Sequence, residues 1–354
     1  MLAATGLPHP ITALASLAVF LVLVLVGVLM PVPYVIEEPG PAIDVLGEYQ
    51  DQQILTVEGH RTYPTDGRLM MTTVSIDGSP GYSVTPVELV RSWFDPSRRV
   101  MPRELLFPED QTREQTDLEN SVQMNTSQQD AVAAALTELD MPYDRDVVVA
   151  AVEKGAPADG TLQVGDAIVE VNGVRGSDID ALRSASAKTP AGSTVEMTVR
   201  RDGRTKHLKV PTHQVDGEAK MGIVLAPGYV FPVDVHISIG QIGGPSAGTM
   251  FALSIYDELT PGALTGGKDI AGTGTIDADG TVGPIGGIRQ KMVGARKAGA
   301  DYFLAPGDNC DDVTGHVPDG LHVVRIDTLD DALDATKTIA KTGSVDGLPT
   351  CETP

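Results

Sequence analysis

The chain has 354 residues, with 26 Lys and Arg side chains against 48 Asp and Glu, which gives a formal net charge of −22. Such acidity argues against nucleic acid or anionic lipid as a partner, because both would be repelled, and it favours solubility. This length predicts two or three domains.

The first predicted element is a membrane anchor. Residues 11–30 form a run of 20 positions without a charged side chain, which is long enough to cross the hydrocarbon core as a helix. A cleaved signal peptide is the alternative, but a basic segment before the run and a clear small-x-small cleavage site are missing. We therefore expect a short tail at residues 1–10 and an uncleaved anchor over residues 11–33. No Lys or Arg occurs before Arg61, so charge does not set its orientation.

The segment from residue 34 to residue 124 is the least informative. Residues 54–57 and 68–76 have the composition of strands, and residues 87–94 that of a short helix. Residues 108–120 are polar and predict a connection. No chemistry is assigned to this segment.

The next segment has the order of a peptide-binding module. A β-branched strand at residues 146–152 is followed by a Gly-Asp turn at Gly165, a strand at residues 167–171 and an Asn-Gly turn at Asn172. This order resembles a bacterial PDZ domain over residues 125–212. The resemblance implies capture of extended peptides as an added strand. The expected wall of the groove is the strand with Val147, Val148 and Val149.

A candidate nucleophile follows in the run from Gly243 to Gly248. Pro245 suits the first turn of a helix, so Ser246 is expected in that turn, with an apolar helical face after it and a strand over residues 234–239 before it. A helix N-terminus stabilises the negative charge of a tetrahedral intermediate. The expected active-site loop consists of Gly243, Gly244, Pro245 and Ala247.

A candidate base lies 45 positions later. Residues 270–276 and 281–285 predict short strands joined by a hairpin turn, and Gly286-Gly287 then leads into a helix that Gly299 could cap. Lys291 lies one turn inside that helix. A lysine serves as a base when burial lowers its pKa, although a lone helical lysine is more commonly a solvated surface charge.

These motifs resemble the proteolytic domain of Lon-type serine peptidases over residues 222–342. The resemblance rests on residues 244–248, 269–274 and 280–291. It implies Ser246 as nucleophile, Lys291 as general base, and Thr273 as the residue that orients the lysine. The chain departs from the family at Gly243, where many Lon proteases carry an aspartate.

Two other motifs occur in this part of the chain. Gly244-x-Ser246-x-Gly248 also fits the nucleophile elbow of α/β-hydrolases, with Asp308 and His316 in the right order, but a proline directly before the serine suits a helix start better. Residues 262–269 fit a phosphate-binding loop until Asp269, where magnesium needs Ser or Thr. We therefore expect no ATPase module.

The remaining side chains bear on compartment and cofactors. Cys310 and Cys351 could pair in an exported domain, or could remain two thiols. His316 and His322 flank a turn without a zinc motif, so no metal and no cofactor are expected.

The order of the segments resembles bacterial membrane-anchored proteases with PDZ and Lon domains, so the expected fold class is α+β and multidomain. The expected Lon-type domain spans residues 213–345, with a tail at 346–354. The resemblance implies an ATP-independent Ser-Lys endopeptidase with an extracytoplasmic body, which cuts exported or membrane-proximal polypeptides captured by the PDZ domain. Homo-oligomerisation is expected by resemblance only. Two alternatives stay open: a latent peptidase that acts as a peptide-binding scaffold, and an esterase that uses a Ser-His pair.

Overall fold

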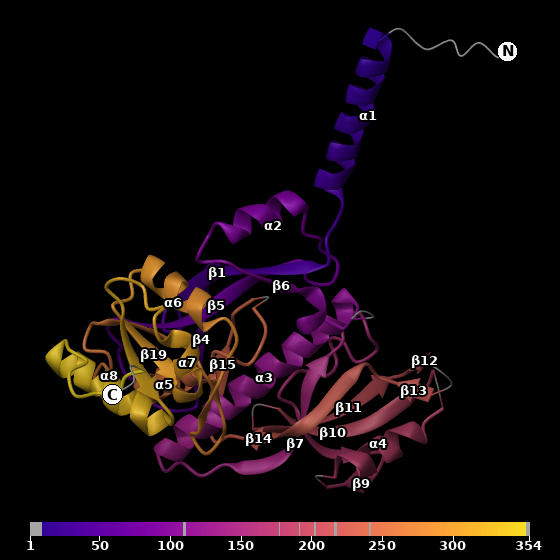
Figure 1. The fold of residues 1–354 in the computed structure, drawn as a ribbon. Helices are drawn as coiled ribbons and strands as arrows, with labels where there is room; N and C mark the ends of the chain where they lie inside the picture. Colours follow the sequence, from indigo (N-terminus) through magenta and orange to yellow (C-terminus); the bar gives the residue numbers. More distant parts are fainter. Residues whose placement is uncertain are drawn as a thin grey trace. The chain divides into compact units, whose positions relative to one another are not determined.

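The computed structural model describes residues 9–351, except 109–110, 177, 191, 202, 216–217 and 241. Two compact units divide the chain: Met1–Pro39 with Val74–Arg113, and Gly40–Thr73 with Glu114–Pro354 (Figure 1). The long strands β1 (Tyr34–Asp44) and β5 (Arg68–Asp77) run through both units.

The first unit contains the apolar helix α1 (His9–Leu29). At 1.5 Å per residue its 21 residues are about 32 Å long, close to the thickness of a bilayer core. The window Thr12–Leu29 has a mean hydropathy of 2.8, and none of it is buried. In the described part of the chain, α1 is thus a helix long and apolar enough to span a membrane.

The rest of the first unit is a small α/β layer. It contains α2 (Pro86–Trp93), β6 (Arg99–Pro102) and the 3-10 helix η1 (Arg103–Leu105). β6 pairs antiparallel with the first residues of β1. A capping box starts α2, because Thr85 and Glu88 satisfy each other's backbone N–H groups. The predicted helix at residues 87–94 is therefore confirmed.

The second unit is organised around a mainly parallel sheet with the strand order β20-β19-β16-β5-β1. Its further strands are β16 (Asp269–Gly272), β19 (Tyr302–Pro306) and β20 (His322–Ile326). Alternate residues face opposite sides, as the pleat requires. Ile270 and Leu304 pack in one core cluster with Phe251, while Ala271 and Phe303 pack in another with Met292.

Helices cover both faces of this sheet. On the Phe251 side lie α5 (Gly248–Leu259) and α8 (Leu329–Thr342), and on the other side lies α6 (Ile288–Lys297). The short elements of this unit are η2 (Gly307–Asn309), α7 (Cys310–Val313), β2 (Glu48–Tyr49), β3 (Gln52–Gln53), β4 (Leu55–Glu58), β15 (Asp234–Ile237), β17 (Thr275–Ile276) and β18 (Val282–Gly283). β17 and β18 pair antiparallel, which confirms the predicted hairpin.

A second, antiparallel sheet has the order β11-β10-β8-β7-β14. Its elements are β7 (Asp144–Val152), β8 (Ala167–Val171), β9 (Val174–Arg175), α4 (Ile179–Ala187), β10 (Thr194–Arg201), β11 (Arg204–Pro211) and β14 (Ile223–Val230), with the side ribbon β12 (His213–Val215) and β13 (Glu218–Lys220). The last strand, β14, comes after the boundary expected at residue 212. The edge strand of this sheet is therefore formed by the segment that leads into the next domain.

The strand that was expected to wall the peptide groove is an interior strand. Val147, Val148 and Val149 are buried in β7, which pairs with β14 over its whole length and with β8 at Val148. A peptide cannot add to a strand whose two edges already carry neighbours. The open edge of the sheet on this side belongs to β14.

The long helix α3 (Arg113–Glu138) precedes this sheet. Its first residues fall in the segment that was expected to be a polar connection, so that prediction is wrong. The helix packs Ala131, Val132, Ala134 and Ala135 into the core cluster that holds Phe251. The polar sequence of its N-terminal half did not predict a helix, because most of the stability of a helix in a protein comes from tertiary packing and not from its composition.

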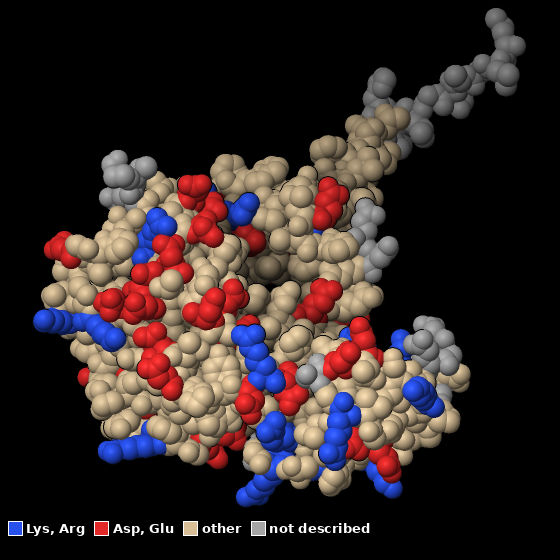
Figure 2. Space-filling view, turned by 90° about the horizontal axis from the view of Figure 1, so that it is seen from below, with Lys and Arg blue, Asp and Glu red and all other residues tan. Residues whose placement is uncertain are grey.

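Charged side chains of both signs lie on the face of the molecule seen in Figure 2. Figure 2 shows Asp and Glu side chains spread over one face, with Lys and Arg side chains standing among them singly or in small groups. The acidity read from the composition is therefore distributed on this face rather than gathered in one patch.

Cys310 and Cys351 form a disulfide that closes a separation of 41 residues. The bridge ties the C-terminal segment to α7, and the Thr314 hydroxyl also donates to the Cys351 carbonyl at 2.8 Å.

Loss of this bridge should destabilise the second unit. Chain entropy predicts that the Cys310→Ser/Cys351→Ser variant loses about 2–4 kcal/mol in the free energy of unfolding. Urea denaturation with and without reductant measures this, and the variant, having no bridge to reduce, should not respond to reductant. Equal midpoints for the parent in both conditions would contradict the prediction.

Candidate active site

Ser246 lies in the turn between β15 and α5, two residues before the helix begins at Gly248. The expectation that Pro245 and Ser246 form the first helical turn is therefore wrong by two residues. Ala247 is the N-cap, and the Phe251 N–H donates to its carbonyl at 3.0 Å. Ser246 consequently sits at the positive end of the α5 dipole without belonging to the helix.

The loop before the serine is held by α3. The Ser127 hydroxyl donates to the Pro245 carbonyl at 2.9 Å, and the Gly244 N–H donates to the Asn120 carbonyl at 3.3 Å. A Cβ at position 243 would lie 2.6 Å from the Asn120 Cβ. The close packing of α3 therefore explains why glycine stands at this position, where many Lon proteases carry an aspartate.

The Ser246 carbonyl is also fixed. It accepts the Thr273 hydroxyl at 2.9 Å and the Gly274 N–H at 2.9 Å. Gly274 has φ +150°, and a Cβ there would lie 2.5 Å from the Thr249 hydroxyl, so this position requires glycine. Two strand-end residues thus hold the backbone of the serine.

Lys291 lies one turn inside α6, and its Nζ reaches both hydroxyls. It lies 2.7 Å from the Ser246 Oγ and 2.8 Å from the Thr273 Oγ1. Because the Thr273 hydroxyl donates its proton to the Ser246 carbonyl, its oxygen can only accept from the lysine. The other close contact of the Lys291 amine is with the Ser246 hydroxyl.

Burial sets the charge of this lysine. Its side chain is 1% exposed, and desolvation lowers the pKa of Lys291 to about 7. Loss of water disfavours the ammonium form, so roughly half of the molecules carry a neutral amine near pH 7. A neutral amine within hydrogen-bond distance of a serine hydroxyl can accept its proton.

The remaining loop residues differ in what they can supply. Gly244 already donates to Asn120 and proline has no N–H, so neither offers an oxyanion donor in this conformation. Gly243 serves the contact with α3 described above. Ala247, next to the serine at the start of α5, has the position from which a backbone N–H can reach an oxyanion.

The rival histidine does not join this cluster. His316 is exposed, and its Nδ1 contacts the Thr314 carbonyl at 2.9 Å, whereas the Ser246 hydroxyl contacts Lys291. Within the described residues, no group of three or more His, Cys, Asp and Glu side chains is arranged to hold a metal ion.

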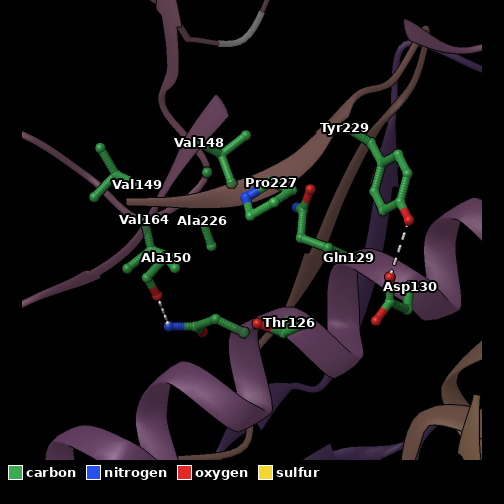
Figure 3. A pocket seen from close by; sticks show the side chains of 12 residues that line it. Thr126, Gln129, Asp130, Val148, Val149, Ala150, Val164, Ala226, Pro227 and Tyr229 are labelled. Atoms are coloured by element: carbon green, nitrogen blue, oxygen red, sulfur yellow. Dashed lines mark hydrogen bonds between the residues drawn. The ribbon is translucent and has the colours of Figure 1, made fainter. Parts of the chain in front are cut away.

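α3 also contacts the antiparallel sheet, around a small cavity of about 20 Å³ (Figure 3). The Asn125 amide donates to the Ala150 carbonyl at 2.8 Å, and the Tyr229 hydroxyl donates to Asp130 at 3.2 Å. Burial, with the nearby Asp130 charge, raises the pKa of Tyr229 to about 12, so the phenol keeps its proton. Sequence patterns had not indicated α3 as the helix that links this sheet to the serine loop.

A larger groove of about 960 Å³ lies between that sheet and β15. Its walls include Gln163–Ala167, Arg200 and Arg201 of the sheet, and residues 234–238 in and after β15. β15 pairs with β4, and the chain runs from β15 directly to the serine loop. The groove therefore lies beside the strand that precedes the serine loop.

Comparison with known proteins identifies two domains. Residues 227–338 match the Lon protease (S16) C-terminal proteolytic domain, and residues 116–212 match the PDZ domain. A solved PDZ domain of an SdrC-like protein from Listeria monocytogenes aligns with 23% of this chain and 86% of its own, at 23% identity and a TM-score of 0.22.

Curated relatives match over the C-terminal part of the chain. It is 40% identical to Lon protease 1 of Sorangium cellulosum over 106 residues, and 33% identical to Lon protease 1 of Bacillus subtilis over 109 residues. The alignments cover 28% and 29% of this chain, and 13% and 14% of the relatives. The chain thus contains a PDZ domain, followed by a Lon-type proteolytic domain that holds Ser246, Thr273 and Lys291.

Proposed function

We propose that the chain is an ATP-independent serine endopeptidase in which Ser246 is the nucleophile and Lys291 the general base. The observation that carries the proposal is the 2.7 Å contact between the Ser246 Oγ and the Lys291 Nζ, whose pKa is lowered to about 7. A base near neutral pKa combines a large unprotonated fraction with useful basicity at physiological pH.

The proposed reaction follows from these positions. The neutral Lys291 amine takes the proton of the Ser246 hydroxyl while the Ser246 Oγ attacks the carbonyl carbon of the scissile peptide bond. The oxyanion forms at the start of α5, beside the Ala247 N–H. The Lys291 ammonium then protonates the leaving amine as the C–N bond breaks, and the acyl-enzyme remains. In the second half, Lys291 takes a proton from a water molecule while the water oxygen attacks the ester carbon. Lys291 returns that proton to the Ser246 oxygen as the ester bond breaks, which restores the hydroxyl and the neutral amine.

Thr273 acts in this proposal as a positioning residue. Its hydroxyl accepts from Lys291 and donates to the Ser246 carbonyl, so it fixes the amine relative to the serine backbone. Without it, the flexible lysine side chain would lose one of its two anchoring contacts.

Independence from ATP has its own support. Asp269 stands where a phosphate-binding loop needs Ser or Thr, and its carboxylate pairs with Arg68 at 2.6 Å. That pairing lowers the pKa of Asp269 and holds the carboxylate in place. We therefore propose that residues 262–269 bind no nucleotide and that this peptidase cleaves polypeptides without ATP.

Location forms a further part of the proposal. We infer that α1 anchors the chain in the membrane and that the remainder lies on the extracytoplasmic side. The apolar length of α1 supports the anchor. The Cys310–Cys351 disulfide supports an oxidising compartment.

We further infer that the PDZ domain captures polypeptides at the outer edge of β14 rather than at β7. Ile223 and Leu225 in this strand, and Met221 two residues before it, are half-buried against the cluster that holds Leu182 of α4. Side chains of an added strand could share this apolar surface, while its backbone would pair with β14. Exported or membrane-proximal polypeptides are the substrates that this arrangement would serve.

Removal of either dyad side chain should abolish peptide cleavage. Ser246→Ala and Lys291→Ala are expected to lower kcat by about 10⁴-fold or more, because residues that act as a unit fail together. Cleavage of unfolded casein by the full chain without ATP measures this. The matched control is Lys297→Ala, which removes an exposed lysine from the same helix and should change nothing. Full activity of Lys291→Ala would contradict the proposal.

The pH profile should follow the lysine. Since the neutral amine is the active form and its pKa is about 7, kcat/KM should rise through pH 7 and level off above roughly pH 8. Lys291→Arg, which stays charged, should be inactive across the range. A flat profile between pH 6 and 9 would refute this assignment.

For catalysis, the hydroxyl of Thr273 should matter more than the shape of its side chain. Thr273→Val is expected to lower kcat by about 10- to 100-fold, the value of a hydrogen bond to the ammonium that forms when Lys291 takes the serine proton, and to move the midpoint of the pH profile. Thr273→Ser keeps the hydroxyl and should restore most of the rate. Equal loss in both variants would instead indicate a packing role.

A further inference from the structure

Trp93, the chain's single tryptophan, is one of several large apolar side chains that the first unit leaves exposed. Trp93 is 66% exposed, Phe94 84% and Leu105 69%. Val87, Val90 and Leu106 are exposed beside them in sequence. A soluble surface seldom carries so many large apolar groups within one short segment.

α2 is apolar on two opposite faces. Leu89 packs inward with Ile36 and Val84, while Val87 and Val90 point outward with i,i+3 spacing. Phe94 follows four residues after Val90 and extends the outward face. An exposed apolar face of this kind is commonly covered, either by protein or by lipid.

The position of this surface identifies its occupant. The Val32 N–H donates to the Val84 carbonyl at 2.9 Å, and the Arg103 N–H donates to the Pro33 carbonyl at 3.1 Å. Val32 follows the last residue of α1 by three positions, so it lies within about 10 Å of that helix end. Both apolar segments, α2 and η1, are thus attached to the chain where it would leave the bilayer.

Contacts within the first unit agree with this placement. α1 and α2 contact each other, and Figure 1 shows α2 running crosswise to α1. An α1 that spans the bilayer along its normal would therefore place α2 along the surface. Aromatic side chains such as Trp93 prefer this interfacial layer, and long arginine side chains such as Arg91 can reach the head groups from it.

We propose that the outward face of α2 together with the tip of η1 is a second membrane contact, in which Val87, Val90, Trp93, Phe94, Leu105 and Leu106 enter the interfacial layer of the bilayer. The proposal rests on α1 as the proposed anchor. The contact would fix the first unit on the membrane at two places, instead of leaving it to pivot on one helix.

Trp93 reports on this contact directly. The full chain is placed at one copy per nanodisc of phosphatidylcholine, with or without bromine on the acyl chains, and its tryptophan emission is recorded. The expected result is a blue-shifted emission that brominated lipid largely quenches and acrylamide quenches little. The double variant Val90→Ser/Phe94→Ser should lose quenching by bromine and gain quenching by acrylamide.

Val317→Ser is the matched control, since Val317 is 41% exposed and Val90 46%. It should leave both quenching constants unchanged. Emission quenched by acrylamide and untouched by bromine, with the chain retained in the disc, would overturn the contact and leave the anchor intact. Protection from both quenchers would also overturn it, because protein rather than lipid would then cover Trp93. Failure of the chain to enter discs would refute the anchor and the contact together.

Discussion

A buried amine is the constraint on which the site depends. Burial away from water raises the free energy of the charged Lys291 ammonium, so its pKa falls to about 7. The neutral amine is then available to accept a proton from a neighbouring hydroxyl. In the proposed mechanism the same burial that would cost stability in an ordinary core supplies the base. The fold accommodates that cost by giving the amine two oxygen partners, Ser246 and Thr273.

The helix α3 gives this site its frame. It holds the serine loop through Ser127 and Asn120, and it contacts the PDZ sheet through Asn125 and Asp130. One rigid element therefore borders both the proposed peptide-capturing sheet and the proposed nucleophile. The position of α3 also explains the glycine at position 243, because the helix occupies the space that a larger side chain would need.

Local patterns predicted the parts of the molecule that depend on neighbours in sequence. The apolar run of α1, the hairpin before α6 and the positions of Ser246 and Lys291 all carry such patterns. Local patterns failed where tertiary packing determines the structure. The polar start of α3 did not predict a helix, and the β-branched sequence of β7 did not indicate that β14 pairs with its edge. The meeting of Ser246, Thr273 and Lys291 was inferred from a resemblance, because no spacing rule brings them together.

The central claim, a Lys291 amine that is about half uncharged at neutral pH, is tested most directly by its own titration. NMR of the full chain with lysine side chains labelled at Cε, assigned by comparison with Lys291→Met, would follow this amine from pH 5 to 11. The account predicts a midpoint near pH 7, well below the ordinary lysine value of 10.5. A midpoint near 10.5 would show a charged surface-like lysine and would contradict the proposed base.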